Sequence, residues 1–235
     1  ASRSAHTTGG DELDMIKRLC LTALLGWVPV CFGQVAPAAP WVGMDFLGVP
    51  CTGKPAGYGP YDYLQRGPLR ENLSLVERFH FTPEVEQLES GKSGYIYQDL
   101  DYTLRAWPNH HRALNAMMRY QSRLDRAGFK RLRGSEVPRV ECYLQRAITF
   151  SPGDASSMLI FAILLQKSDA IEKARQVYER AIQIAPNDMQ LQYNYALLLV
   201  EEGELAQARE IADLVYEKGF PLPGLKRKLS AAAKP

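Results

Sequence analysis

Two stretches of this chain superimpose on each other with a shift of 34 residues. The shift aligns small residues and proline-marked ends: Ala162, Ala174, Ala181 and Pro186 in the first stretch with Ala196, Ala208, Val215 and the Phe220-Pro221 corner in the second. Alanine at fixed helical positions lets neighbouring helices approach closely, and a proline after the second helix marks the end of each unit. This period predicts an all-α solenoid of paired helices joined by tight turns.

The helical pattern divides the chain from residue 94 onward into pairs. Residues 97–107 place Leu100, Leu104 and Trp107 on one face and end at Pro108, as the second helix of a partial repeat would. Three pairs are expected after it: 109–126 with 139–150, 154–167 with 170–184, and 188–201 with 205–218. An insertion at 127–138 separates the helices of the first pair, and residues 222–233 would cap the stack. The expected solenoid is residues 94–235, preceded by an irregular arm with short helices at 39–93.

The period and its alanine positions resemble the tetratricopeptide repeat (TPR) family over roughly 140 residues. The resemblance implies an all-α, TPR-like helix-turn-helix solenoid of about three repeats, with an irregular Pro/Gly/aromatic N-terminal arm and a C-terminal capping helix. In this family the first helices line a concave groove that binds other proteins. The implied groove positions are Arg112, Asn115, Arg119, Leu159, Ile163, Tyr193, Leu197 and Val200. They do not match the clamp of lysines and asparagines by which some relatives hold a C-terminal carboxylate.

Composition argues against a nucleic-acid-binding protein but excludes few other functions. The chain has 235 residues, of which 46% are hydrophobic and 23% charged, as in an ordinary folded soluble protein. A formal net charge of +2 is too close to balance to indicate a nucleic-acid partner.

The beginning of the chain is typical of a secretory signal. A positive segment at 15–18 precedes an apolar run at 19–32, which is too short to span a membrane. We expect a signal peptide at 15–38, cleaved after Gly33 or Ala38, and interpret residues 1–14 as an upstream, non-native or untranslated segment. Val30 before Cys31 disfavours a lipoprotein anchor, so no stable membrane anchor is expected after cleavage. Residues 99–112 and 59–63 are also similar to uncharacterised exported bacterial TPR proteins, which favours a periplasmic or extracellular location.

Removal of the signal would leave two cysteines, Cys51 and Cys142. In an oxidising compartment a Cys51–Cys142 disulfide is the favoured hypothesis, because it would fasten the arm to the solenoid. The alternative is that Cys142 is a buried apolar residue of its helix and that Cys51 is a free thiol.

The arm combines many glycines and prolines with large aromatic residues. Glycine and proline at this density disfavour both helix and strand, but the aromatic content is too high for a solvated linker. We therefore expect the arm to pack on its own solenoid, where it would fill the apolar groove, or on a neighbouring subunit. The expected anchors are Trp41, Phe46, Tyr58, Tyr61 and Tyr63.

Several motifs suggest chemistry but lack the rest of a site. Gly91-Lys92-Ser93 lacks the earlier glycine of a phosphate loop, because position 86 is Glu86. His110 and His111 could bind a metal with His80, but adjacent helical residues point about 100 degrees apart, and helix capping is the favoured interpretation. Glu77, Glu84 and Glu86 near His80 lack a nucleophile with a matched base. The basic residues Arg126, Lys130, Arg131 and Arg133 favour a solvated loop over a contact with an acidic partner or anionic lipid.

The sequence therefore predicts a non-enzymatic, exported protein-protein interaction module, an adaptor or scaffold, with no catalytic, cofactor or metal residues. Its partner would be another protein bound in the concave groove. The alternative is a self-assembling structural subunit whose arm docks into a neighbouring solenoid to form an oligomer or filament. An enzyme ranks third.

Overall fold

A computed structural model describes residues 39–128 and 138–233 of the chain. The described residues contain no extended strand and form ten α-helices, preceded by a short 3-10 turn, η1 (Tyr63–Gln65). The expected upstream segment, the signal peptide and most of the basic loop lie outside the described residues. No helix in the described part of the chain is both long and apolar enough to cross a membrane.

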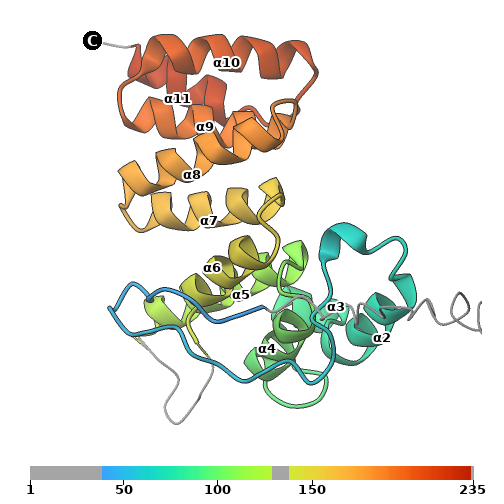
Figure 1. Ribbon diagram of the computed structural model, residues 1–235. Helices are drawn as coiled ribbons and strands as arrows, with labels where there is room; N and C mark the ends of the chain where they lie inside the picture. Colours follow the sequence, from blue (N-terminus) through green and yellow to red (C-terminus); the bar gives the residue numbers. More distant parts are fainter. Residues whose placement is uncertain (1–38, 129–137, 234–235) are drawn as a thin grey trace, which may run out of the picture. The chain divides into compact units, whose positions relative to one another are not determined.

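The first half of the fold contains five helices, of which the first two lie within the predicted arm. They are α2 (Arg70–His80), α3 (Pro83–Gln87), α4 (Ile96–Ala106), α5 (His111–Arg126) and α6 (Val140–Phe150). Helix α4 packs on α5, α5 packs on α6, and the short helices α2 and α3 lie against α4 and α5 (Figure 1). Most buried apolar side chains of α3 to α6 form one core cluster that includes Leu100, Leu104, Leu114 and Leu144. Those of α2, Leu73 and Val76, belong to a small separate cluster with Tyr63 and Trp107.

The second half consists of two helical pairs and a final helix. The first pair is α7 (Ala155–Lys167) with α8 (Ile171–Ile184), and the second is α9 (Met189–Glu201) with α10 (Leu205–Glu217). Each helix of the first pair begins 34 residues before its counterpart in the second, as the sequence period predicts. Helix α11 (Gly224–Ala232) packs on α9 and α10 (Figure 1). All described residues belong to one compact unit, Ala36–Pro235.

The same local signals begin and separate these helices in both pairs. Asp154 caps α7 and Asp188 caps α9, each accepting backbone N–H bonds through its carboxylate. Asp169 and Gly203 occupy equivalent turns between the paired helices, with φ of 61° and 82°. Glycine adopts this left-handed conformation without a steric penalty, and aspartate is among the residues that tolerate it.

The alanines of the repeat lie where helices meet. Ala162, Ala174, Ala196 and Ala208 are all completely buried. Helix α7 lies between the two halves, since Ile160 and Leu164 belong to the first core and the rest of its buried face to the second. This double burial explains why α7 is apolar on nearly all sides, a pattern typical of an internal helix.

Candidate interaction surfaces

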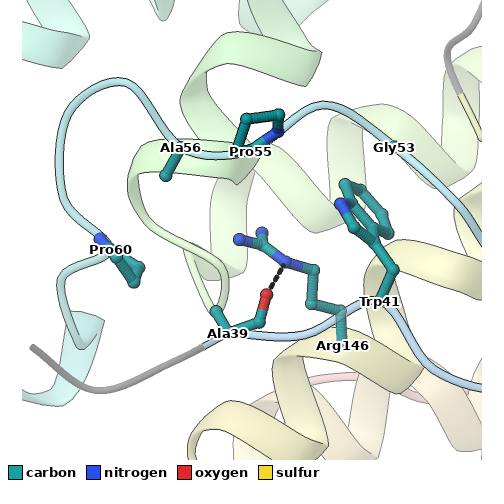
Figure 2. Close-up of a pocket in the computed structure, with 7 residues that line it drawn as sticks. All are labelled: Ala39, Trp41, Gly53, Pro55, Ala56, Pro60 and Arg146. Carbon is teal, nitrogen blue, oxygen red and sulfur yellow. Dashed lines mark hydrogen bonds between the residues drawn. The ribbon is translucent and has the colours of Figure 1, made fainter.

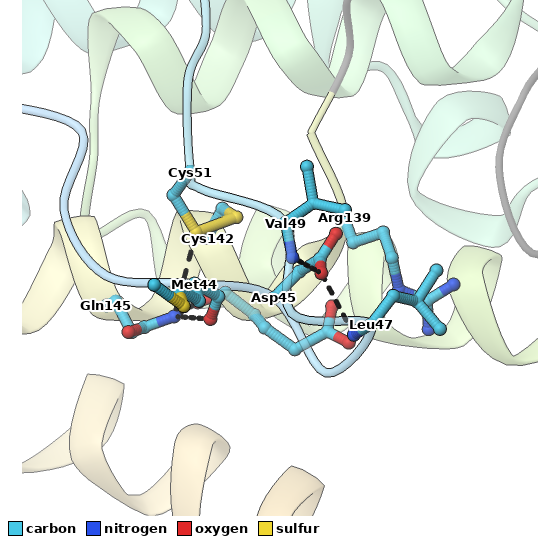
Figure 3. The surroundings of a disulfide bond; sticks show 9 residues. Met44, Asp45, Leu47, Val49, Cys51, Arg139, Cys142 and Gln145 are labelled. Carbon is cyan, nitrogen blue, oxygen red and sulfur yellow. Dashed lines mark hydrogen bonds and ion pairs between the residues drawn. A yellow bond between two sulfur atoms is a disulfide. The ribbon is translucent and has the colours of Figure 1, made fainter.

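The arm is fastened to its own chain through α6. Cys51 and Cys142 form a disulfide across 91 residues of sequence, so the favoured pairing is confirmed (Figure 3). One turn beyond Cys142, Gln145 donates through its amide to the Met44 carbonyl oxygen (2.8 Å). The Trp41 ring meets Tyr143 edge to face, with ring centroids 5.1 Å apart. The side-chain contacts of the arm thus fall on α4 to α6 and the segments between and after them. The sequence leaves two placements open, the groove of the first helices and a neighbouring subunit.

Four of the five predicted arm anchors are buried or half-buried. Tyr63 is buried, and Trp41, Tyr58 and Tyr61 are half-buried. Phe46 differs because 42% of its surface is exposed. It belongs to a tight loop that turns back between Met44 and Pro50, which leaves most of the apolar side chains of the loop on the outside. Phe46 therefore does not anchor the arm in this structure.

The segment before α5 forms a buried polar hub with the arm. The Asn109 amide donates to Asp62 Oδ1 (2.7 Å) and to Asp154 Oδ2 (2.9 Å), and its oxygen accepts from the Tyr63 backbone N–H (2.8 Å). His111 Nε2 lies 2.8 Å from Asp154 Oδ2. Burial opposes ionisation of Asp154, but hydrogen bonds and charge from His111, with further hydrogen bonds, outweigh it and lower the pKa of this carboxyl.

His110 caps α5 and is itself completely buried. Its Nδ1 accepts from the Ala113 backbone N–H (3.1 Å), which places the ring proton on Nε2, 3.1 Å from Glu77 Oε1. Burial lowers the pKa of His110, and the contact with Glu77 only partly opposes this shift. The two adjacent histidines therefore bond to different carboxylates, Glu77 and Asp154.

The other candidate chemical groups serve local structure. Asp99 Oδ2 accepts the backbone N–H groups of Lys92 and Ser93, so the Gly91-Lys92-Ser93 turn encloses a carboxylate. His80 and the Ser93 hydroxyl also bond to Asp99 Oδ1. Ser93 meets His80 through the same Nδ1 that faces Asp99, whereas a relay needs opposite ring nitrogens. No group of three or more potential metal-binding side chains converges within residues 39–128 and 138–233.

The arginine end of the predicted groove is partly covered by α3. Arg112 pairs with the Glu86 carboxylate, Arg119 donates to the Glu86 carbonyl oxygen, and Arg123 donates to the Leu88 carbonyl oxygen. The hydrogen bond from Arg112 lowers the pKa of Glu86. Arg112 remains half-exposed, and Asn115 is exposed beside it. These contacts join α5 to α3, which sequence periodicity alone does not predict.

Two predicted groove residues are not on the surface. Leu159 is 9% exposed and Tyr193 is 5% exposed, and both belong to the second core. Tyr193 is covered by the beginning of α11, where its hydroxyl accepts the Leu225 backbone N–H (3.2 Å), and by the Phe220 ring. We correct the prediction for these two residues, because the neighbouring helices bury the face that an isolated pair would expose.

Arg112 and Arg119 are bonded to Glu86 of α3, and the other four predicted residues define a smaller surface, which we call the first-helix face. It contains Asn115 on α5, Ile163 on α7, and Leu197 and Val200 on α9, where the three apolar side chains are half-buried. Helix α5 packs on α7, and α7 packs on α9, so these residues lie along successive neighbours. Gln190 and Asn194 share the same side of α9 by helical spacing, but they are not among the predicted groove positions. The chain matches no protein-family model and no curated protein.

Proposed function

We propose that this chain is a TPR-like protein-interaction module that binds a protein partner through the first-helix face. The observation that carries the proposal is the stacking of α5, α7 and α9, with half-buried apolar residues beside exposed amides on one side. Mixed apolar and polar surface of this kind is typical of partner-binding sites on repeat proteins. The 34-residue recurrence of buried alanines supports the TPR-like architecture.

We further propose that the module acts outside the reducing cytoplasm. The buried Cys51–Cys142 disulfide supports this location, because such bonds persist in oxidising compartments. The signal-like pattern at 15–38 gives independent sequence support.

The arm contacts favour an adaptor over a self-assembling subunit. The arm is bonded to its own α6 by a disulfide and to the segment before α5 by the Asn109 hub. A docked arm leaves the first-helix face available to a different protein, whereas an exchanged arm would join subunits.

The proposal is tested by affinity capture from the exported fraction of the source cells with matched variants. Leu197→Arg and Asn115→Arg change the first-helix face, and Leu214→Arg places the same charge on an exposed leucine of α10. We expect a discrete partner to be retained by the wild type and by Leu214→Arg, and to be lost with both face variants. Asn115 is exposed, so its variant reports on binding when Leu197→Arg alters packing. Equal retention by all variants, or retention by none including the wild type, would refute the assignment of this face.

A further inference from the structure

A pocket of about 350 Å³ lies between the arm and α6. Apolar groups make most of its wall, and its lining residues are Ala39, Trp41, Gly53, Pro55, Ala56, Pro60 and Arg146 (Figure 2). Arg146 is the single charged side chain among them. Figure 2 shows its guanidinium group extending from α6 toward the space between Ala56 and Pro60.

Arg146 is only 2% exposed and bonds to backbone oxygens. Its Nε donates to the Ala39 carbonyl oxygen (2.8 Å), Nη1 to that of Leu104 (2.7 Å), and Nη2 weakly to that of Arg105 (3.5 Å). A guanidinium group has five N–H donors, so two have no acceptor among the described residues. The carbonyl oxygens at the end of α4 offset part of its charge through the helix dipole.

The nearby carboxylate is already used by other groups. Asp101 accepts from Arg105 Nε (2.9 Å) through one oxygen and from the Tyr143 hydroxyl (2.6 Å) through the other. No carboxylate lies within ion-pair distance of Arg146 in the described part of the chain. Asp101 therefore pairs with Arg105 and not with Arg146, and burial lowers the pKa of Arg146 to about 10. A buried cation without a counterion is costly, and a bound anion would relieve that cost.

We propose that this pocket binds a small organic carboxylate, with its anionic group on Arg146 and its hydrocarbon part against Pro55, Ala56 and Pro60. A carboxylate matches the single excess positive charge and the planar donors of a guanidinium group. A doubly charged phosphate would leave one negative charge uncompensated against largely apolar walls. The carboxylate belongs either to a free acid or to the C-terminus of a chain. This site is separate from the first-helix face and does not depend on the proposed function.

The pocket is built largely by the arm, so binding requires the docked arm. The Gly53 Cα packs so closely on the Trp41 ring that an added Cβ would lie 2.5 Å from it. The Trp41 indole N–H donates to the Lys54 carbonyl oxygen (3.3 Å), and its ring lies 4.8 Å from the Arg146 guanidinium carbon. The indole N–H signal of Trp41 is therefore a local reporter for the pocket.

The test is a nuclear magnetic resonance titration of the oxidised, ¹⁵N-labelled full chain. Butyrate represents a free acid and N-acetylalanine a chain terminus, with butyramide, N-acetylalaninamide and chloride as controls at matched ionic strength. We expect saturable shifts of the Trp41 indole signal with at least one carboxylate and with none of the controls. Binding by butyrate alone identifies a free acid, and binding by N-acetylalanine alone identifies a chain terminus.

Three variants make the test specific. Ala56→Leu fills the pocket and leaves Arg146 in place, Arg146→Lys keeps the charge but loses the planar donors, and Ala206→Leu adds the same bulk on an exposed part of α10. We expect about tenfold weaker binding with Ala56→Leu and Arg146→Lys, and wild-type binding with Ala206→Leu. The proposal is overturned by the absence of a saturable shift with both carboxylates in the folded wild type. Equal shifts with the controls, or unchanged binding in Ala56→Leu, would also overturn it.

Discussion

Asn109 is the residue at which the arm, α5 and α7 are joined by hydrogen bonds. Its amide bonds to Asp62 and Asp154, and its oxygen accepts from the backbone of Tyr63, while the residue itself is completely buried. Both Asp62 and Asp154 need donors to compensate for water lost on folding. The helix boundary before α5 therefore depends on one side chain that satisfies groups from three segments.

Replacement of Asn109 by alanine should be strongly destabilising. The change removes donors from Asp62 and Asp154, so we expect the free energy of unfolding to fall by about 2–4 kcal/mol. Asn115→Ala, at an exposed position of α5, should alter it by less than about 0.5 kcal/mol. Chemical denaturation of both variants measures the difference, and equal small effects would show that the hub is not important for stability.

His110 should make stability depend on pH in the mildly acidic range. Its pKa in the folded protein lies below the ordinary value of 6.5, because burial disfavours the imidazolium form. The positive charge of Arg112 adds to this effect, and the contact with Glu77 only partly opposes it. The unfolded chain therefore binds more protons, and the free energy of unfolding should decrease as pH falls below about 6.5. In His110→Asn, whose amide oxygen can still cap α5, this decrease between about pH 8 and 5 should flatten. An unchanged pH profile of the variant in denaturation curves would contradict the assignment.

Neighbouring helices of the repeats can pack closely because the alanine side chains between them are small. Ala162 and Ala196 are completely buried at equivalent positions of α7 and α9, where neighbouring helices approach. Added methyl groups would force the helices apart, because protein interiors are close-packed. A larger side chain on the exposed side of α10 would instead extend into solvent.

Ala196→Leu should therefore be destabilising, whereas Ala206→Leu should not. We expect a loss of about 1–3 kcal/mol in the free energy of unfolding for Ala196→Leu. Ala206 is exposed, so its variant should remain within about 0.5 kcal/mol of the wild type. Thermal and chemical denaturation provide the comparison. Similar stability of the two variants would mean that α9 does not make the close contact seen in the structure.

The sequence predicted elements better than it predicted their outer contacts. The predicted ends of α7 to α10 agree with those in the structure within about one residue, because alanines, caps and turns are local signals. The burial of Tyr193 and the cover of Arg112 by Glu86 depend on α11 and α3, which pack from elsewhere in the chain. Periodicity identifies the apolar side of a helix, but it does not identify every element that covers it.

At the scale of the whole molecule, the Cys51–Cys142 disulfide joins the arm covalently to the helices. The bond closes a loop with a sequence separation of 91, and both cysteines are buried. Such a long closed loop restricts the unfolded chain and stabilises the native state on the chain-entropy model.

Removal of the disulfide should loosen the arm as well as lower global stability. For the Cys51→Ala, Cys142→Ala double variant we expect the free energy of unfolding to fall by up to about 4 kcal/mol. Amide hydrogen exchange should increase most in the arm around Trp41, which depends on α6 for its contacts. If exchange increases equally in α10, the disulfide supports the whole fold and does not selectively hold the arm.

The most direct test asks whether each arm completes its own molecule, as a free first-helix face requires. Equal amounts of ¹⁴N-labelled and ¹⁵N-labelled chains are reduced and unfolded together, refolded under oxidising conditions, and digested without reduction. Mass spectrometry then identifies the isotopes in each peptide pair that contains Cys51 and Cys142. We predict pairs in which both peptides carry the same label. Abundant mixed-label pairs would show that arms are exchanged between subunits and would contradict a self-contained adaptor.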